Sequence, residues 1–299
     1  MSGLCDTTMN RRQVLKMAAM AGGVAMLGPR RSWASPQNSG TTSRWAFLAD
    51  THIPADPENT YRGFFPYRNM QKVVAQIASD LPEGVVIAGD LARLEGLIGD
   101  YEKASELLTP LVEKRPICVA LGNHDHRDNF LRVFDSYGGG RQVVTGKHVV
   151  IANAGSVRLI VLDSLMYVNK VPGLLGKAQR TWLQDCLRTS DDRPTILFFH
   201  HTLGDGDGDL LDVLRLFDII AGVPSVKAVV YGHSHAYGFS ERDGIHLINL
   251  PATGYNFSDA QPVGWVEALL TSQGGKFTLR AVGGNTDIDG QTHNLRWRS

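Results

Sequence analysis

Cysteine is scarce in this chain, and long hydrophobic runs are missing. The 299 residues include only three cysteines, Cys5, Cys118 and Cys186. So small a number excludes a disulfide-rich scaffold and a cysteine-based zinc finger. No run of about 18 apolar residues occurs, so the sequence predicts no stable membrane span. An excess of charge is also absent, because 30 Lys and Arg residues balance 30 Asp and Glu residues.

The charge is distributed unevenly along the chain. Residues 1–34 carry five basic groups and one acidic group, and the rest of the chain carries 25 basic and 29 acidic groups. A mildly acidic body lacks the clustered Lys and Arg that a nucleic-acid surface requires. We therefore expect no nucleic-acid partner.

The basic N-terminus has the pattern of an export signal. Arg11 and Arg12 precede an uncharged stretch at 17–27, and small residues stand at the −3 and −1 positions of a cut after Ala34. Adjacent arginines before such a stretch resemble a bacterial twin-arginine (Tat) signal. We expect a Tat-type signal peptide at 1–34 and a periplasmic or secreted protein. A first helix of the fold is the alternative, but three glycines and a proline disfavour it.

The sequence after the signal alternates short apolar runs, typical of strands, with amphipathic stretches, typical of helices. Strands are expected at 45–49, 85–88, 117–121, 159–162, 195–199 and 226–231, with hairpins over 238–250 and 264–282. Helices are expected near 67–79, 100–114, 127–136, 176–188 and 209–221. The alternation predicts one α/β domain at 44–285. A polar linker at 35–43 precedes it and a polar surface tail at 286–299 follows it. We assign the turn of the last hairpin to Gly274 and Gly275.

Five of the predicted strands end in side chains that bind metals. In chain order these are Asp50 and His52, Asp90, Asn123 and His124, His200, and finally His233 and His235. Ligands of open α/β sheets bind at the carboxyl ends of the strands, so we expect these loops to meet. Carboxylate, imidazole and amide together suit Zn, Mn or Fe better than Mg or Ca alone.

Taken together and in order, the five loops resemble the calcineurin-like metallophosphoesterase family. The matching blocks are Asp50-Thr51-His52, Gly89-Asp90, Gly122-Asn123-His124-Asp125, His200-His201 and Gly232-His233-Ser234-His235. The resemblance implies a four-layer α-β-β-α sandwich, in which two mixed β-sheets pack face to face and are flanked by helices. It also implies a dinuclear metal centre at the C-terminal ends of the strands.

The resemblance further implies a role for each ligand and a reaction. Asp50, His52 and His235 would hold one metal ion, Asn123, His200 and His233 would hold the other, and Asp90 would bridge them. A carboxylate shared by two cations offsets their repulsion, and a bridging water becomes a hydroxide near neutral pH. We expect two ions (Mn, Fe or Zn) and hydrolysis of a phosphomonoester or phosphodiester by in-line attack of that hydroxide. His124 would protonate the leaving group.

Four further residues are candidates for contacts with the substrate. Tyr61 and Arg62 lie in the long loop that follows His52, where they could stack on a substrate or pack against the domain edge. Arg93 stands three residues after Asp90 and could fork onto a phosphate oxygen, or else point to solvent. His201 is next to a predicted ligand and would support it or face the substrate.

Two other functions stay open at this point. A non-catalytic binding scaffold could keep the phosphoesterase fold, but every ligand block is intact here. A nuclease of the same superfamily is disfavoured by the acidic body and by the lack of any extra domain. The expected partner is a small-molecule phosphoester. The choice between monoester and diester, the metal identity and the oligomeric state are left open by the sequence.

Overall fold

The computed structural model describes residues 42–134 and 143–299. The predicted signal peptide lies outside the described residues, as does the predicted linker up to residue 41. All described residues belong to one unit, Gln37–Ser299. Among the helices of the described part, none is long and apolar enough to cross a bilayer.

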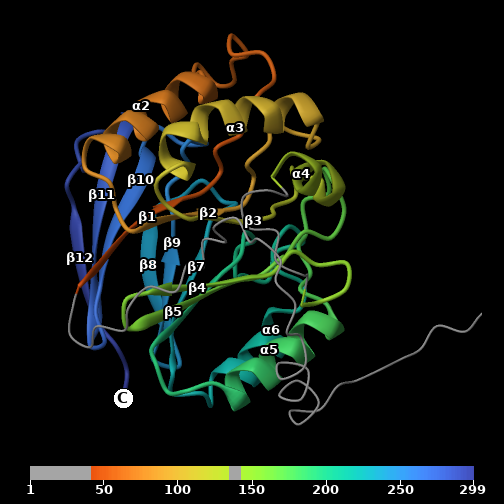
Figure 1. Ribbon diagram of the computed structural model, residues 1–299, viewed down its shortest axis with the longest axis vertical. Helices are drawn as coiled ribbons and strands as arrows, with labels where there is room; N and C mark the ends of the chain where they lie inside the picture. Colours follow the sequence, from red (N-terminus) through yellow and green to blue (C-terminus); the bar gives the residue numbers. More distant parts are fainter. Residues whose placement is uncertain (1–41, 135–142) are drawn as a thin grey trace, which may run out of the picture. The chain divides into compact units, whose positions relative to one another are not determined.

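Within the described residues, twelve strands form two six-stranded sheets (Figure 1). The first sheet contains β1 (Ser43–Leu48), β2 (Gly84–Ala88), β3 (Ile117–Ala120), β10 (Pro262–Leu270), β11 (Gly274–Gly284) and β12 (Thr292–Arg296). The second contains β4 (Val150–Ala154), β5 (Val157–Val161), β6 (Thr195–Phe198), β7 (Val226–Tyr231), β8 (Gly238–Arg242) and β9 (Ile245–Asn249). Their spatial orders are β12-β11-β10-β1-β2-β3 and β4-β5-β6-β7-β9-β8. Both sheets are mixed, since β1, β2 and β3 run parallel, as do β5, β6, β7 and β9, while the remaining neighbours pair antiparallel.

Five helices of the described part of the chain cover the outer faces of the two sheets. They are α2 (Pro66–Ser79), α3 (Ile98–Val112), α4 (Arg127–Phe134), α5 (Lys177–Thr189) and α6 (Val213–Ile220). Figure 1 shows α2 and α3 over one sheet and α5 and α6 over the other. The α2 sequence explains its position: Pro66 opens the helix, and Met70, Val73, Val74 and Ile77 form one buried stripe at helical spacing.

Three hydrophobic layers therefore hold the domain together. The middle layer lies between the sheets, where the rings of Phe47 and Phe198 meet edge to face with centroids 4.8 Å apart. The two outer layers join each sheet to its helices. This arrangement confirms the predicted four-layer α-β-β-α sandwich.

The C-terminal segment differs from the sequence-based expectation. We predicted a surface tail at 286–299, but Thr292–Arg296 pairs with β11 as edge strand β12. Trp297 is only 7% exposed and Arg298 donates hydrogen bonds to five backbone carbonyls. The strand was not predicted because β12 contains mostly polar residues, as an edge strand buries only one of its faces.

The turn between β10 and β11 was also misplaced. The chain turns at residues 271–273, and Gly274 and Gly275 already belong to β11. A Cβ on Gly274 would overlap the carbonyl oxygen of Leu295 in β12. The glycines therefore permit a close approach of neighbouring strands, not the reversal of the chain.

Candidate metal centre

The five predicted loops meet where parallel strands of the two sheets end. Asp50 and His52 follow β1, Asp90 follows β2, and the Asn123 loop follows β3. The second sheet contributes His200 after β6, with His233 and His235 after β7. Backbone hydrogen bonds join these loops; for example, His52 N–H donates to Asp90 O at 2.9 Å. Side chains that lie up to 185 positions apart in the sequence thus share one site.

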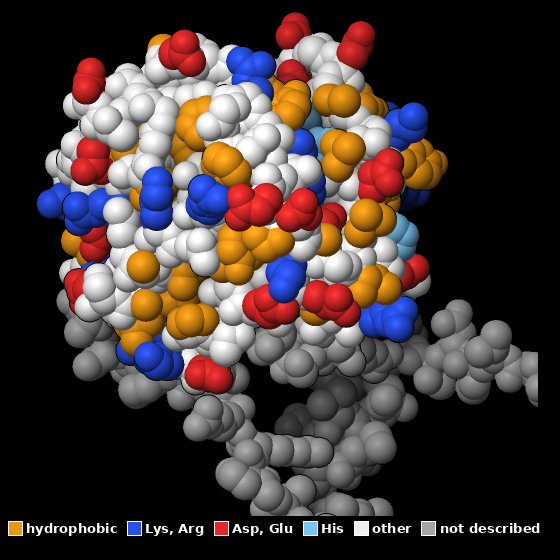
Figure 2. Space-filling view, turned by 90° about the horizontal axis from the view of Figure 1, so that it is seen from above, with side chains coloured by type: hydrophobic (Ala, Val, Ile, Leu, Met, Phe, Trp, Pro, Cys, Tyr) orange, Lys and Arg blue, Asp and Glu red, His pale blue; other side chains and the backbone are white. Residues whose placement is uncertain are grey.

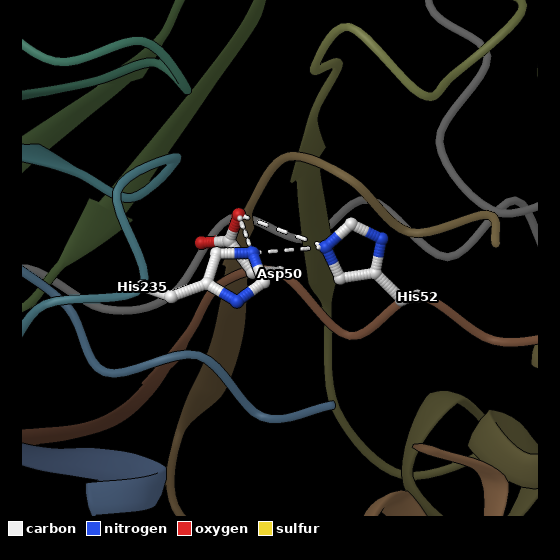
Figure 3. A group of neighbouring side chains, drawn as sticks. All are labelled: Asp50, His52 and His235. Carbon is white, nitrogen blue, oxygen red and sulfur yellow. Dashed lines mark hydrogen bonds and ion pairs between the residues drawn. The ribbon is translucent and has the colours of Figure 1, made fainter. Parts of the chain in front are cut away.

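The first group of candidate ligands contains Asp50, His52 and His235 (Figure 3). Asp50 Oδ1 lies 3.3 Å from His235 Nε2 and 4.0 Å from His52 Nε2. The two imidazole Nε2 atoms are 3.1 Å apart. All three side chains are buried.

The second group is built around Asp90 and His200. Asp90 Oδ2 lies 3.2 Å from His200 Nε2, and the same nitrogen lies 3.2 Å from His233 Nδ1. Asp90 Oδ2 is also 3.8 Å from His52 Nε2 of the first group. The Asp90 carboxylate therefore lies within reach of both groups.

Asn123, in the loop after β3, carries an acceptor that no donor satisfies. Its Oδ1 is buried and accepts no hydrogen bond in the described structure. The next residue, His124, donates its backbone N–H to Asp90 Oδ1 at 2.9 Å, which keeps the Asn123 loop against the shared carboxylate. A buried amide oxygen without a donor is costly unless a ligand satisfies it.

The hydrogen bonds of the four imidazoles test whether metal ions fit. The outer nitrogen of each ring contacts a backbone carbonyl: His52 with Arg93 O, His200 with Ala88 O, His235 with Tyr255 O and His233 with Gly208 O, at 2.6–3.2 Å. A carbonyl accepts only, so each outer nitrogen is the N–H donor. In the neutral rings, the inner nitrogens then present lone pairs to one another at 3.1 and 3.2 Å. Facing lone pairs beside two carboxylates are the donor set of a cation site.

Burial and charge adjust the protonation of these imidazoles. Burial lowers the pKa of His52 to about 3 and that of His233 to about 4, so both rings are neutral at pH 7. Burial also opposes a charge on His200, but the carboxylates of Asp90 and Asp50 raise its pKa to about 9. A proton on His200 thus replaces cationic charge when no metal is bound.

The backbone at the ligand positions is unusual. Five of the seven predicted ligands have positive φ angles of 48–72°, namely Asp50, His52, Asp90, His233 and His235. Residues with a side chain seldom adopt this left-handed region, and such strain concentrates at functional sites. Glycine leaves room between the loops, since a Cβ on Gly122 would overlap the Asp90 carboxylate and one on Gly232 would overlap that of Asp50.

Residues 43–237 match the calcineurin-like phosphoesterase family. The chain belongs to that family. A cyclic adenosine monophosphate phosphodiesterase, CpdA of Pseudomonas aeruginosa, is 26% identical over 219 residues, which cover 71% of this chain and 76% of the relative. The glycerophosphodiester phosphodiesterase GpdQ of Enterobacter lignolyticus is 26% identical, with 70% of this chain and 76% of the relative covered. Among solved structures, a dimetal phosphatase from Danio rerio has a TM-score of 0.65 at 14% identity, with 85% and 99% covered.

This phosphoesterase is therefore a metal-dependent hydrolase of phosphoesters, and its cofactors are two metal ions. The named relatives are enzymes and the candidate ligand groups are intact, and both observations argue against a non-catalytic scaffold. The Pseudomonas aeruginosa and Enterobacter lignolyticus relatives are named as phosphodiesterases of cyclic adenosine monophosphate and of glycerophosphodiesters.

The other residues that the sequence predicted for the site lie around the two groups of candidate ligands. His124 lies beside the first ligand group, with its ring centroid 5.4 Å from that of His52. Tyr61 is 41% exposed next to this group, and Arg93 lies over the Tyr61 ring at 4.9 Å. Arg62 donates to the carbonyl oxygens of Asn256 and Phe257 at 3.0 and 2.9 Å, so it holds a neighbouring loop.

His201 does not fit a substrate contact. Its side chain is fully buried, and its Nδ1 is hydrogen-bonded to Ser164 Oγ at 2.8 Å. Its ring packs against that of His233 with centroids 4.8 Å apart. His201 therefore supports a ligand from behind, because no substrate atom can reach it.

Two features of this phosphoesterase escaped the sequence analysis. Asp125 is fully buried and accepts hydrogen bonds from the backbone of Leu91, Ala92 and Gly122 at 2.9–3.2 Å and from the Tyr101 hydroxyl at 3.1 Å. It thereby ties the Asp90 loop to the Asn123 loop. Tyr255 and Phe257, from the loop between β9 and β10, stack against the ligand imidazoles. Asp125 stands inside a recognised block and could have been noticed there, whereas the two aromatics lie in a loop without any motif.

Proposed function

We propose that this phosphoesterase hydrolyses small phosphodiesters, with the seven clustered side chains as the ligands of two metal ions. The observation that carries the proposal is the position of Asp90, whose Oδ2 lies 3.2 Å from His200 and 3.8 Å from His52. One carboxylate between two ligand groups is what two cations about 3.5–4 Å apart require. The diester preference is supported by the two relatives, which are named for cyclic nucleotide and glycerophosphodiester substrates.

The residues of the chain divide the work of hydrolysis between them. When bound, the two cations supply Lewis acidity, which lowers the pKa of a coordinated water and offsets charge on the phosphoryl oxygens. Asp50, His52 and His235 would hold one cation and Asn123, His200 and His233 the other, and both would share Asp90. The carbonyl contacts of the outer imidazole nitrogens fix each ring in the orientation that binding needs.

His124 is placed to donate a proton to the leaving group. Its Nδ1 donates to Leu94 O at 2.8 Å, which fixes the ring and leaves Nε2 to carry the transferable proton. The side chain is only partly buried, so it can exchange protons with solvent. Its place beside His52 puts the acid at the edge of the ligand cluster, where an alkoxide leaving group would emerge.

The experiment that tests this function compares a diester with a monoester. Metal-free protein reconstituted with Mn, Fe or Zn should hydrolyse bis-p-nitrophenyl phosphate with a kcat/KM at least tenfold above that for p-nitrophenyl phosphate. Asp90→Ala, assayed in parallel, should show neither activity. A preference for the monoester would overturn the diester assignment, and a lack of any metal-dependent activity would overturn the function.

We further propose that the protein is exported by the twin-arginine route, with cleavage after Ala34. The support is the paired Arg11 and Arg12, the uncharged stretch behind them and the small residues at the cut. The mature periplasmic or secreted protein should begin near Ser35, and replacing both arginines with lysine should leave it inside the cell. Finding soluble cytosolic protein with residues 1–34 intact would contradict the proposal.

A further inference from the structure

Three aromatic side chains line one side of the metal centre. We call Tyr61, Tyr255 and Phe257 the aromatic wall. The Tyr255 ring packs on both ligand imidazoles of the first group, with centroids 4.7 Å from His52 and 4.6 Å from His235. Phe257 is stacked on His235 at 4.3 Å and 28°, and Tyr61 meets Tyr255 edge to face at 4.7 Å. The wall is thus in direct contact with the side chains proposed to hold a metal ion.

Two of the three rings remain open to solvent. Tyr255 is only 4% exposed and forms the base of the wall, whereas Tyr61 is 41% and Phe257 is 48% exposed. Histidine surface is visible among hydrophobic and basic side chains on the face shown in Figure 2. Large aromatic surfaces left in water beside a reaction centre mark a place where an apolar part of a ligand can be buried.

Guanidinium groups frame the wall on both sides. The Arg93 guanidinium lies 4.9 Å from the centroid of Tyr61, and its Nε donates to Asn59 Oδ1 at 3.1 Å. The Arg62 guanidinium lies 5.7 Å from the centroid of Phe257. Arg93 interacts electrostatically with the Asp100 carboxylate, and both guanidinium groups carry a positive charge that can attract an anionic ligand to the wall.

The wall is also held in place before any ligand arrives. Arg62 belongs to the same loop as Tyr61, and its hydrogen bonds to Asn256 O and Phe257 O join that loop to the one carrying Phe257. The backbone of Tyr61 is paired with Phe64 through two hydrogen bonds of 3.0 and 2.9 Å. A rigid aromatic surface loses little conformational entropy on binding, which favours affinity.

We propose that the exposed faces of Phe257 and Tyr61 form a subsite for a planar heteroaromatic group of the substrate, a nucleobase in chemical class. The inference rests on the proposed phosphodiesterase function and selects among its substrates. A nucleobase can stack on these rings while its phosphate occupies the metal centre beside them. A glycerol or other aliphatic ester group has no π-face and gains nothing comparable. Phe257 and Tyr61 are therefore specificity-determining residues.

The test compares two diesters that share a leaving group, thymidine 5′-(p-nitrophenyl) phosphate and ethyl p-nitrophenyl phosphate. The ratio of their kcat/KM values should fall roughly 5- to 100-fold in Phe257→Leu and in Tyr61→Leu, the range of one base–aromatic stacking contact. Tyr167→Leu is the matched control, because Tyr167 is 65% exposed and lies outside the wall. It should leave the ratio within twofold of the parent value.

A binding measurement separates failure of the subsite from failure of the function. By calorimetry, adenosine monophosphate should bind the metal-loaded protein at least tenfold more tightly than ribose 5-phosphate, and Phe257→Leu should abolish the difference. Equal losses on both diesters, or no advantage for the nucleotide in the parent protein, would overturn the subsite while diester hydrolysis continued. If the parent protein hydrolysed neither diester, the proposed function would fail, and the calorimetric comparison would still decide the subsite.

Discussion

Arg298 allows a direct test of how firmly the C-terminus is built into the domain. Its guanidinium donates hydrogen bonds to the carbonyl oxygens of Ile220, Ala221 and Val223 at the end of α6, at 2.6–3.2 Å. It also donates to Val226 O at 3.0 Å and to Asp243 O at 2.8 Å. One side chain thus connects α6, β7 and the turn between β8 and β9.

The cost of removing this side chain follows from its partners. A hydrogen bond from a charged donor contributes about 1.5–3 kcal/mol to the free energy of unfolding. The contributions of the five hydrogen bonds cannot simply be summed, because partly exposed carbonyls can bind water when the side chain is removed. A cation at a helix C-terminus contributes about 0.3–1 kcal/mol more. We expect Arg298→Ala to lower the free energy of unfolding by about 2–4 kcal/mol. For a domain of this size, that corresponds to a decrease in Tm of roughly 5–15 °C.

Urea unfolding followed by circular dichroism measures this change, with Arg296→Ala as the control. Arg296 lies two residues away on β12 and is exposed, so its removal should cost less than about 0.5 kcal/mol. Metal content should be the same in both variants, because neither residue touches the ligand loops. Equal stability of Arg298→Ala and the parent protein would refute the idea that the C-terminal segment is part of the fold.

Four further predictions concern the site. Asp90→Ala removes the shared carboxylate, so bound metal and turnover should fall by several orders of magnitude; near-normal turnover at saturating metal would contradict the two-metal arrangement. His124→Ala should retain its metals but lose more turnover on alkyl diesters than on nitrophenyl diesters, whose leaving groups need no proton; equal losses would exclude the acid role. Gly122→Ala places a Cβ into the Asp90 carboxylate and should weaken metal binding at least tenfold by calorimetry, while unaltered affinity would show that the loops can separate. Asp125→Asn should also weaken metal binding. The control is Asp212→Asn, which alters a carboxylate bound to residues 175–180 and should leave metal binding unchanged. Equal effects of the two substitutions on metal binding would mean that Asp125 has no special positioning role.

Much of the fold could be predicted from the sequence, because its signals are local. Apolar runs such as Val85–Ala88 and the helical stripe of α2 encode a strand or helix by periodicity alone. The sequence likewise predicted that the loops with candidate metal ligands meet, since parallel strands bring their carboxyl ends to one edge. By the same reasoning, strand β12 was missed: its exposed face is polar, and its pairing with β11 is visible only in three dimensions.

The tertiary structure alone decided which residues surround the candidate metal centre. His201 stands beside a ligand in sequence, yet the packing of β6 turns it toward Ser164 and away from the surface. Tyr255 and Phe257 carry no motif, and they reach His52 and His235 only because the loop before β10 passes over the end of β1. The sequence by itself determined the elements and the ligand types, since these depend on neighbouring residues and on strand ends. The contacts that position the candidate ligands and those that line the substrate site join residues far apart in the chain. Only the packing of the two sheets brings these residues together.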